Sequence, residues 1–221
     1  MKLLLVNPNT STNTTEAMLA IAREAAPAGV TINAMTAKFG EPLIVNPAAL
    51  AVAAEAVCAL LREQFDSRFE GVIVSAFGDP GLALLRETLH MPVTGIAEAS
   101  MLEAARHHRF SIVSTTPELV ASIAATARAY GHAKALVSIR ITAGDPISLT
   151  AHPEALEEAL FQACLLALNT DHADAIIIGG GPLASVARRL RSRIPVPLIE
   201  PVPAAVRLAV ARAEEVTGSA Q

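Results

Sequence analysis

An internal repeat constrains the fold of this chain more than any other feature of its sequence. Three segments of the first half align, in the same order, with three of the second half at offsets of roughly 103 to 107 residues. The aligned pairs are residues 2–10 with 109–117, 72–78 with 175–181, and 91–98 with 194–201. One such match could arise by chance, whereas three in order at a nearly constant offset predict two similar lobes.

Short apolar segments alternate along the chain with longer segments of helical periodicity. This alternation is typical of parallel sheets whose two faces are covered by helices. Strands are expected at residues 2–6, 30–34, 72–75, 93–96, 110–113, 135–141, 175–178 and 197–199. Helices are expected at 14–25, 48–63, 98–107, 118–130, 153–168, 183–191 and 204–214. We predict an α/β fold with one lobe from residues 1–97 and 204–221, a second from 98–203, and hinges near Glu98 and Glu200.

The composition excludes several classes of partner. The net charge is −4, and a protein that binds nucleic acid needs a basic face, so no nucleic acid partner is expected. No apolar run approaches the roughly 20 residues of a membrane span, and the apolar run near Met1 is too short for a signal peptide. Two cysteines do not make a disulfide framework. We therefore expect a cytoplasmic protein that does not bind membranes.

Polar and small residues gather in the loops that follow the predicted strands. Ligands of open α/β sheets bind beyond the carboxyl ends of the strands, so in two facing lobes these loops meet in one cleft. The binding candidates are Asn7, Asn9, Ser11, Ala76, Phe77, Gly78, Ser114, Thr115, Thr116, Gly180 and Gly181. Hydroxyl groups beside free backbone N–H groups predict a small-molecule ligand with a carboxylate, imide or ureido group.

Five of the strand and loop segments carry a family likeness. They are 6–11 (VNPNTS), 77–82 (FGDPGL), 92–99 (PVTGIAEA), 110–114 (FSIVS) and 199–202 (IEPV). Together, and in this order, they resemble the aspartate/glutamate/hydantoin racemases, and hydantoin and allantoin racemases in particular. The resemblance implies two Rossmann-like lobes related by a pseudo-twofold, a ligand cleft between them, and no cofactor. It also implies two cysteines on opposite sides of an acidic α-carbon, one thiolate removing a proton and one thiol returning it.

The two family cysteines have no counterpart in this chain. The first would stand just before Phe77, where the chain has Ala76, and the second would stand at Gly180. The cysteines that are present, Cys58 and Cys164, lie within apolar helical segments, where a buried and inert thiol is expected. The residues that follow Gly180 differ from the family pattern too, which favours a natural branch over an engineered loss. This branch lacks the two-thiol mechanism.

Carboxyl and hydroxyl groups are the remaining candidates for catalysis. Asp79, Glu98 and Glu200 lie in or beside the cleft loops, and Ser75 ends a predicted strand. Two carboxyl groups can act as acid and base if the cleft separates their pKa values. The alternative for each carboxyl group is a helix cap or a first-turn acid.

Metal and nucleotide sites are not expected. None of the six histidines lies in the cleft loops, and their spacing matches no metal site. The glycine-rich segment 179–182 lacks both the dinucleotide-binding spacing and a following Lys-Ser/Thr pair.

Three functional hypotheses remain open from the sequence. The first is an enzyme for a small cyclic ureide, an imide or a carboxylated nitrogen compound. It would catalyse isomerisation, decarboxylation or ring opening through an anion that backbone donors stabilise. The second is a non-catalytic binding protein that kept the cleft, and residual racemase activity comes third. The alanine-rich helices lead us to expect a homo-oligomer.

Overall fold

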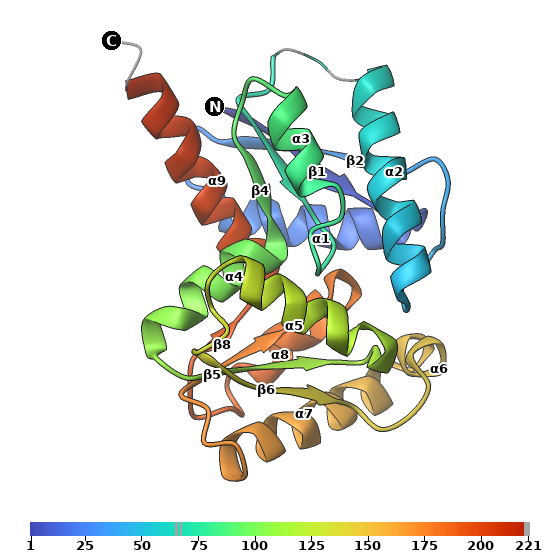
Figure 1. Cartoon of the computed structure of the whole chain (residues 1–221), viewed down its shortest axis with the longest axis vertical. Helices are drawn as coiled ribbons and strands as arrows, with labels where there is room; N and C mark the ends of the chain where they lie inside the picture. Colours follow the sequence, from blue (N-terminus) through green and yellow to red (C-terminus); the bar gives the residue numbers. More distant parts are fainter. Residues whose placement is uncertain (65, 67, 219–221) are drawn as a thin grey trace.

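The computed structural model describes residues 1–64, 66 and 68–218, and it shows two α/β lobes (Figure 1). One parallel sheet has the order β2-β1-β3-β4 and the other has the order β6-β5-β7-β8. The strands of the first sheet are β1 (Lys2–Asn7), β2 (Thr31–Thr36), β3 (Gly71–Val74) and β4 (Val93–Gly95). Those of the second are β5 (Phe110–Ser114), β6 (Leu136–Ile141), β7 (Ala175–Ile178) and β8 (Leu198–Ile199). Every predicted strand is present, and the predicted α/β fold with two parallel sheets is confirmed.

The repeat in the sequence corresponds to a repeat in topology. Each sheet has its first strand beside its second and third, and its fourth strand at one edge. Hydrogen bonds at the strand ends match as well, because Ala37 N donates to Asn7 O at 2.9 Å and Thr142 N donates to Ser114 O at 3.0 Å. The central strands β3 and β7 are buried at every residue, since helices cover both faces of each sheet.

The helices agree with the predicted segments, with two additions. They are α1 (Thr12–Ala25), α2 (Pro47–Gln64), α3 (Leu82–Thr88), α4 (Ile96–Ala104), α5 (Val120–Ala129), α6 (Pro146–Ala151), α7 (Pro153–Asn169), α8 (Ala184–Leu190) and α9 (Pro201–Gly218). Short 3-10 turns, η1 (Ala105–His107), η2 (Pro117–Leu119) and η3 (Gly181–Leu183), adjoin α4, α5 and α8. The sequence pattern did not predict α3 and α6, because seven and six residues are too few to establish a helical period.

Two helices connect the lobes. Helix α4 leads from the last strand of the first sheet to the first strand of the second, and it contacts both β4 and β7. Helix α9 begins at Pro201, three residues before its predicted start, and returns to the first lobe, where it packs against α1, β3 and β4 (Figure 1). The proposed lobe boundaries at 97/98 and 203/204 stay a prediction.

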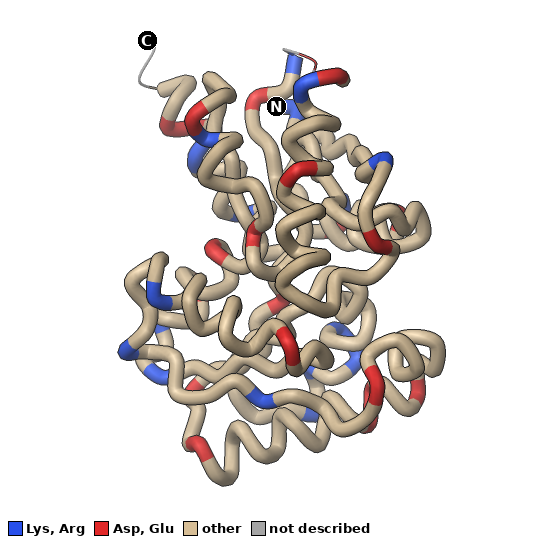
Figure 2. Tube along the Cα trace, turned by 45° about the vertical axis from the view of Figure 1, so that its right-hand side comes forward, with Lys and Arg blue, Asp and Glu red and all other residues tan. Residues whose placement is uncertain are grey.

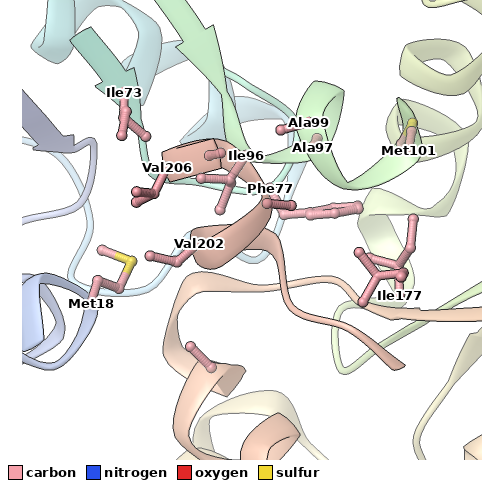
Figure 3. Packing of buried hydrophobic residues seen from close by; sticks show 14 of the residues in the cluster. Met18, Ile73, Phe77, Ile96, Ala97, Ala99, Met101, Ile177, Val202 and Val206 are labelled. Carbon is pink, nitrogen blue, oxygen red and sulfur yellow. The ribbon is translucent and has the colours of Figure 1, made fainter. Parts of the chain in front are cut away.

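One hydrophobic cluster includes buried residues of both lobes. In Figure 3, Phe77 lies between Ile96 and Ala97 of α4 on one side and Ile177 of β7 on the other. Phe77 is only 8% exposed, and burying such a side chain stabilises the fold by about 2–3 kcal/mol. The core is therefore continuous from the first lobe to the second.

The charged residues do not form a single basic surface. Figure 2 shows Lys and Arg interspersed with Asp and Glu over both lobes. Within the part of the chain that the structure describes, no helix is long and apolar enough to cross a membrane.

Candidate functional site

A pocket lies where the strand-end loops of the two lobes meet, and it encloses about 580 Å³ of space, part of it open to solvent. Loops after β1, β3, β5 and β7 form its walls. Nine of the binding and catalytic candidates line it, namely Asn9, Ser75, Ala76, Phe77, Ser114, Thr115, Thr116, Gly180 and Gly181. The strand-end rule thus brings residues from distant parts of the chain to one place.

Asn9 is held in one orientation by its neighbours. Its side-chain oxygen Oδ1 accepts hydrogen bonds from Asn7 Nδ2 at 2.8 Å and from Ser11 N at 2.9 Å. The amide nitrogen Nδ2 of Asn9 therefore points the other way, and it has no acceptor among the described residues. Asn7 and Ser11 do not line the pocket. Asn7 also donates to Thr15 Oγ1, and Ser11 caps α1 by accepting from Thr14 N.

Most hydroxyl hydrogens in the pocket walls point into the protein. Ser75 Oγ donates to Val6 O at 2.8 Å, and Ser114 Oγ donates to Gly179 O at 2.9 Å. Since the Ser114 hydrogen is used, Thr116 Oγ1 is the donor in its 3.2 Å contact with Ser114 Oγ. Ser75 and Thr116 therefore offer lone pairs to a ligand.

Two further kinds of group remain free to bind a ligand. The Thr115 hydroxyl has no hydrogen-bond partner within the described residues, so it can donate or accept. The backbone N–H groups of Ala76 and Gly180 likewise have no acceptor in the described part of the chain. Together with Asn9 Nδ2, these groups give the pocket fixed donors beside fixed acceptors.

The glycines after β7 allow close approach of the two lobes. A Cβ at Gly179 would lie 2.9 Å from Phe77 Cε1, and one at Gly181 would lie 2.7 Å from Met18 Sδ. Gly180 has an extended backbone (φ 163°) that any residue adopts, but a Cβ there would lie 3.0 Å from Leu183 Cγ. Leu183 thus lies against the position where the resemblance places a second cysteine.

The three candidate carboxyl groups do not line this pocket. Asp79 is buried and accepts hydrogen bonds from the N–H groups of Ala97 and Glu98 at the start of α4, so the helix-cap interpretation describes its contacts. Glu200 pairs with Arg188 at 3.1 Å on another face of the molecule. Gly78 does not line the pocket either, and a Cβ there would lie 3.4 Å from Leu50 Cδ1.

Glu98 is part of an ion-pair cluster. Its carboxylate lies 2.7 Å from Arg86 Nη2 and 2.8 Å from Arg212 Nη1. Burial raises the pKa of Glu98, but the hydrogen bonds and charges of Arg212 and Arg86 outweigh burial and hold that pKa below its usual value. The cluster joins α3, α4 and α9, and its place in the fold indicates a structural role.

No side chain among the described residues of the pocket wall is an acid or a base. The described residues that line it are aliphatic, aromatic, hydroxyl-bearing, amide-bearing or glycine and proline. The two thiols lie elsewhere: Cys58 is buried in α2, and burial raises the pKa of Cys164 in α7 to about 12. Both are inert by the usual criterion, because a reactive cysteine needs a lowered pKa. The described residues contain no group of three His, Cys, Asp or Glu side chains that could hold a metal ion.

The sequence interpretation missed the apolar side of the pocket. Leu43 and Ile44, from the loop after β2, and Thr150, from α6 after β6, line it, as do Leu119 and Ile123. Gly179, Pro182 and Leu183 line the pocket as well, but they belong to the loop after β7 that the sequence placed at the cleft. The same strand-end rule could have found Leu43, Ile44 and Thr150, because β2 and β6 end at the same edges of their sheets. The loop from β2 to α2 is long and irregular, and α6 is too short to show a helical period, which hid this relation.

Known proteins share this architecture and much of the sequence. The model of the Asp/Glu/Hydantoin racemase family matches residues 3–209. A hydantoin racemase from Paenarthrobacter aurescens is 30% identical over 95% of this chain and 89% of its own length. Structures of allantoin racemases from Klebsiella pneumoniae and Pseudomonas fluorescens superpose with TM-scores of 0.91 and 0.93, at 32% and 30% identity. The Klebsiella pneumoniae match covers 100% of this chain and 89% of the racemase chain, and the Pseudomonas fluorescens match covers 98% and 92%, respectively.

The chain belongs to the Asp/Glu/hydantoin racemase family, as its loop segments indicated. The correspondence of Ala76 and Gly180 to the two family cysteines stays a prediction. Both residues do line the pocket between the lobes.

Proposed function

We propose that this protein is a cofactor-independent isomerase that binds a small cyclic ureide or imide in the pocket between its lobes and uses no cysteine. One observation carries this proposal: the pocket has fixed hydrogen-bond donors beside fixed acceptors, as a ring with C=O and N–H groups requires. Membership of a racemase family supports isomerisation as the reaction type. Hydantoin and allantoin, which appear in the names of the relatives described above, are cyclic ureides.

The pattern of polar groups favours a ring that carries both C=O and N–H groups. Asn9 Nδ2 and the N–H groups of Ala76 and Gly180 would donate to ring carbonyls, and the oxygens of Ser75 and Thr116 would accept from ring N–H groups. A dicarboxylate has only acceptors and would leave those oxygens unsatisfied. The described lining also contains no Lys or Arg that could pair with a carboxylate.

The reaction that fits this pocket passes through an enolate. The C5 proton of a hydantoin is acidified by its neighbouring carbonyl, and donors aimed at that oxygen stabilise the anion formed when the proton leaves. Here water at the open mouth of the pocket would take and return the proton. Because a positioned acid or base contributes roughly 10²–10⁴-fold, we expect a much slower reaction than one with two thiols.

A binding protein without catalysis is the second candidate. The lack of an ionisable side chain in the described pocket lining favours it, since no group there can take a proton at neutral pH. Decarboxylation of a ring that bears a carboxyl group needs no side-chain base either, and it would appear as loss of CO₂.

Solvent exchange separates these functions. The protein is incubated in D₂O with hydantoin, 5-methylhydantoin and allantoin, and deuterium at C5 is followed by ¹H NMR while calorimetry measures binding. Exchange above the buffer rate, lost in Asn9→Ala and kept in the control Asn13→Ala on the exposed side of α1, is the expected result. Binding without exchange or CO₂ release would support the binding protein. Absence of binding by all three rings would overturn the proposal.

A further inference from the structure

Asp79 joins three elements of the fold at one buried carboxylate. It lies in the loop between β3 and α3, two residues after the pocket residue Phe77, and it is 5% exposed. Its Oδ1 accepts from Ala97 N at 2.9 Å, and its Oδ2 accepts from Glu98 N at 2.8 Å. Its backbone has a left-handed φ of 50°, a conformation that tertiary contacts must maintain.

Helix α4 depends on this carboxylate because it has no cap of its own. The residue before the helix is Gly95, which has no side chain to accept from the first N–H groups. A Cβ at Gly95 would overlap the Asp79 carboxylate. Glycine is therefore required at this position so that Asp79, from another loop, can cap the helix that crosses between the lobes.

The third donor to Asp79 comes from the second lobe. Tyr130, directly after α5, donates its hydroxyl to Asp79 Oδ2 at 2.8 Å. This bond spans 51 residues of sequence and links the end of α5 to the loop of the first lobe. In Figure 1, α4 and α5 lie next to each other at the junction of the lobes, and they are in contact.

We propose that Asp79 is a positioning residue, which ties the pocket loop that carries Ala76 and Phe77 to the crossing helix and, through Tyr130, to the second lobe. One carboxylate then fixes the position of the pocket wall from the first lobe relative to the wall from the second lobe. A movement of α5 relative to α4 would be transmitted to the loop at Ala76.

The ionisable groups nearest Asp79 are Tyr130, which follows α5, and Glu98 of α4. Burial raises the pKa of Asp79 to about 7, against the lowering effect of the bonds from Ala97, Tyr130 and Glu98. The Glu98 charge on α4 also raises it, while Glu98 is itself paired with Arg86 of α3 and Arg212 of α9. Removal of the Tyr130 hydroxyl takes away one stabilising donor, so the pKa of Asp79 must rise further.

Tyr130→Phe tests the proposal with a change of a single hydroxyl group. Two control variants each remove a hydroxyl group that donates only within its own helix. Ser100→Ala removes the bond from Ser100 Oγ to Ile96 O in α4, and Thr126→Val removes the bond from Thr126 Oγ1 to Ser122 O in α5. We expect amide hydrogen exchange in the loop 75–81 to become about 5- to 10-fold faster in Tyr130→Phe, as loss of one buried hydrogen bond implies, and to stay unchanged in the controls.

Two more measurements separate positioning from general stability. The ¹³C signal of the Asp79 carboxyl group should titrate at higher pH in Tyr130→Phe than in the wild type, and not in the controls. Hydantoin should bind more weakly to Tyr130→Phe, a result that rests on the proposed function. If hydantoin binds to no variant, the exchange and titration results still decide the role of Asp79. Unchanged loop exchange in Tyr130→Phe, or equal acceleration in the controls, would overturn the proposal.

Discussion

The loop after β3 and the loop after β7 occupy equivalent places in the two lobes, yet they are built in opposite ways. The β3 loop carries a bulky ring, Phe77, and a buried carboxylate, Asp79. The β7 loop has three glycines in a row, and added Cβ atoms at Gly179 and Gly181 would collide with Phe77 and Met18 of the first lobe. One copy supplies side chains and the other supplies the space for them. Two similar lobes have thus become complementary, and the pocket between them is asymmetric.

Restoring both thiols is the strongest way to break this asymmetry. Ala76→Cys with Gly180→Cys should raise the rate of C5 exchange of 5-methylhydantoin by at least about 10²-fold, because an acid and a base would then face each other. Leu183→Ala belongs in the same variant, since Leu183 Cγ lies 3.0 Å from a Cβ at position 180. Deuterium incorporation by NMR measures the gain. Single cysteine variants serve as controls, and a folded, ligand-binding triple variant with no gain would contradict the alignment of these positions.

Removing the ring from the β3 loop tests complementarity directly. Phe77→Ala should lower the free energy of unfolding by about 3–5 kcal/mol, since it deletes a buried aromatic side chain from the core shared by the lobes. Gly179→Ala alone should also destabilise, because its Cβ lies 2.9 Å from the Phe77 ring. In the double variant that collision is gone. Urea denaturation should therefore show less than the sum of the two single losses, and strict additivity would refute close packing of the two loops.

The buried carboxylate of the β3 loop should make stability depend on pH. Burial raises the pKa of Asp79 from 3.8 to about 7, so the folded state holds this proton more tightly than the unfolded chain. The stabilisation is complete below pH 4 and is lost as the pH rises towards 7, by at most about 4 kcal/mol. Denaturation of wild type and Asp79→Asn from pH 4 to 8 isolates this group, because all other carboxylates cancel. Parallel curves for the two proteins would mean that Asp79 ionises normally.

The smallest expected effect concerns the last glycine of the β7 loop. Gly181→Ala places a Cβ 2.7 Å from Met18 Sδ and 3.1 Å from the Ser75 carbonyl oxygen. The flexible Met18 side chain can move but the backbone oxygen cannot, so we expect a loss of about 1–3 kcal/mol. Gly218→Ala is the matched control, because no described residue lies within 4 Å of its Cβ. Equal thermal midpoints for the two variants would show that the loops are less tightly packed than described.

The sequence predicted the strands and the pocket loops because both follow from local rules. Buried parallel strands are apolar at every position, as in β3 and β7, and the chain must leave each strand at the ligand-binding edge of the sheet. Asn9, Ser75 and Thr116 were found in this way. The sequence could not predict where the carboxyl groups of Asp79, Glu98 and Glu200 point. Their orientation depends on partners elsewhere in the sequence, such as Tyr130 for Asp79 and Arg212 for Glu98.

The order of strands and helices, the repeat, the family and the residues at the strand ends were all present in the sequence by itself. They depend on periodicity and on the short-range geometry of a strand followed by a turn. Only the tertiary structure decided which strand-end groups face a ligand and which are used inside the protein. Asn9 is oriented locally, by Asn7 and Ser11, which lie two residues away on either side. Hydrogen bonds from the distant residues Ala97, Glu98 and Tyr130 turn the Asp79 carboxylate away from the pocket. Such bonds form only after the lobes have packed together, so no local pattern encodes their direction.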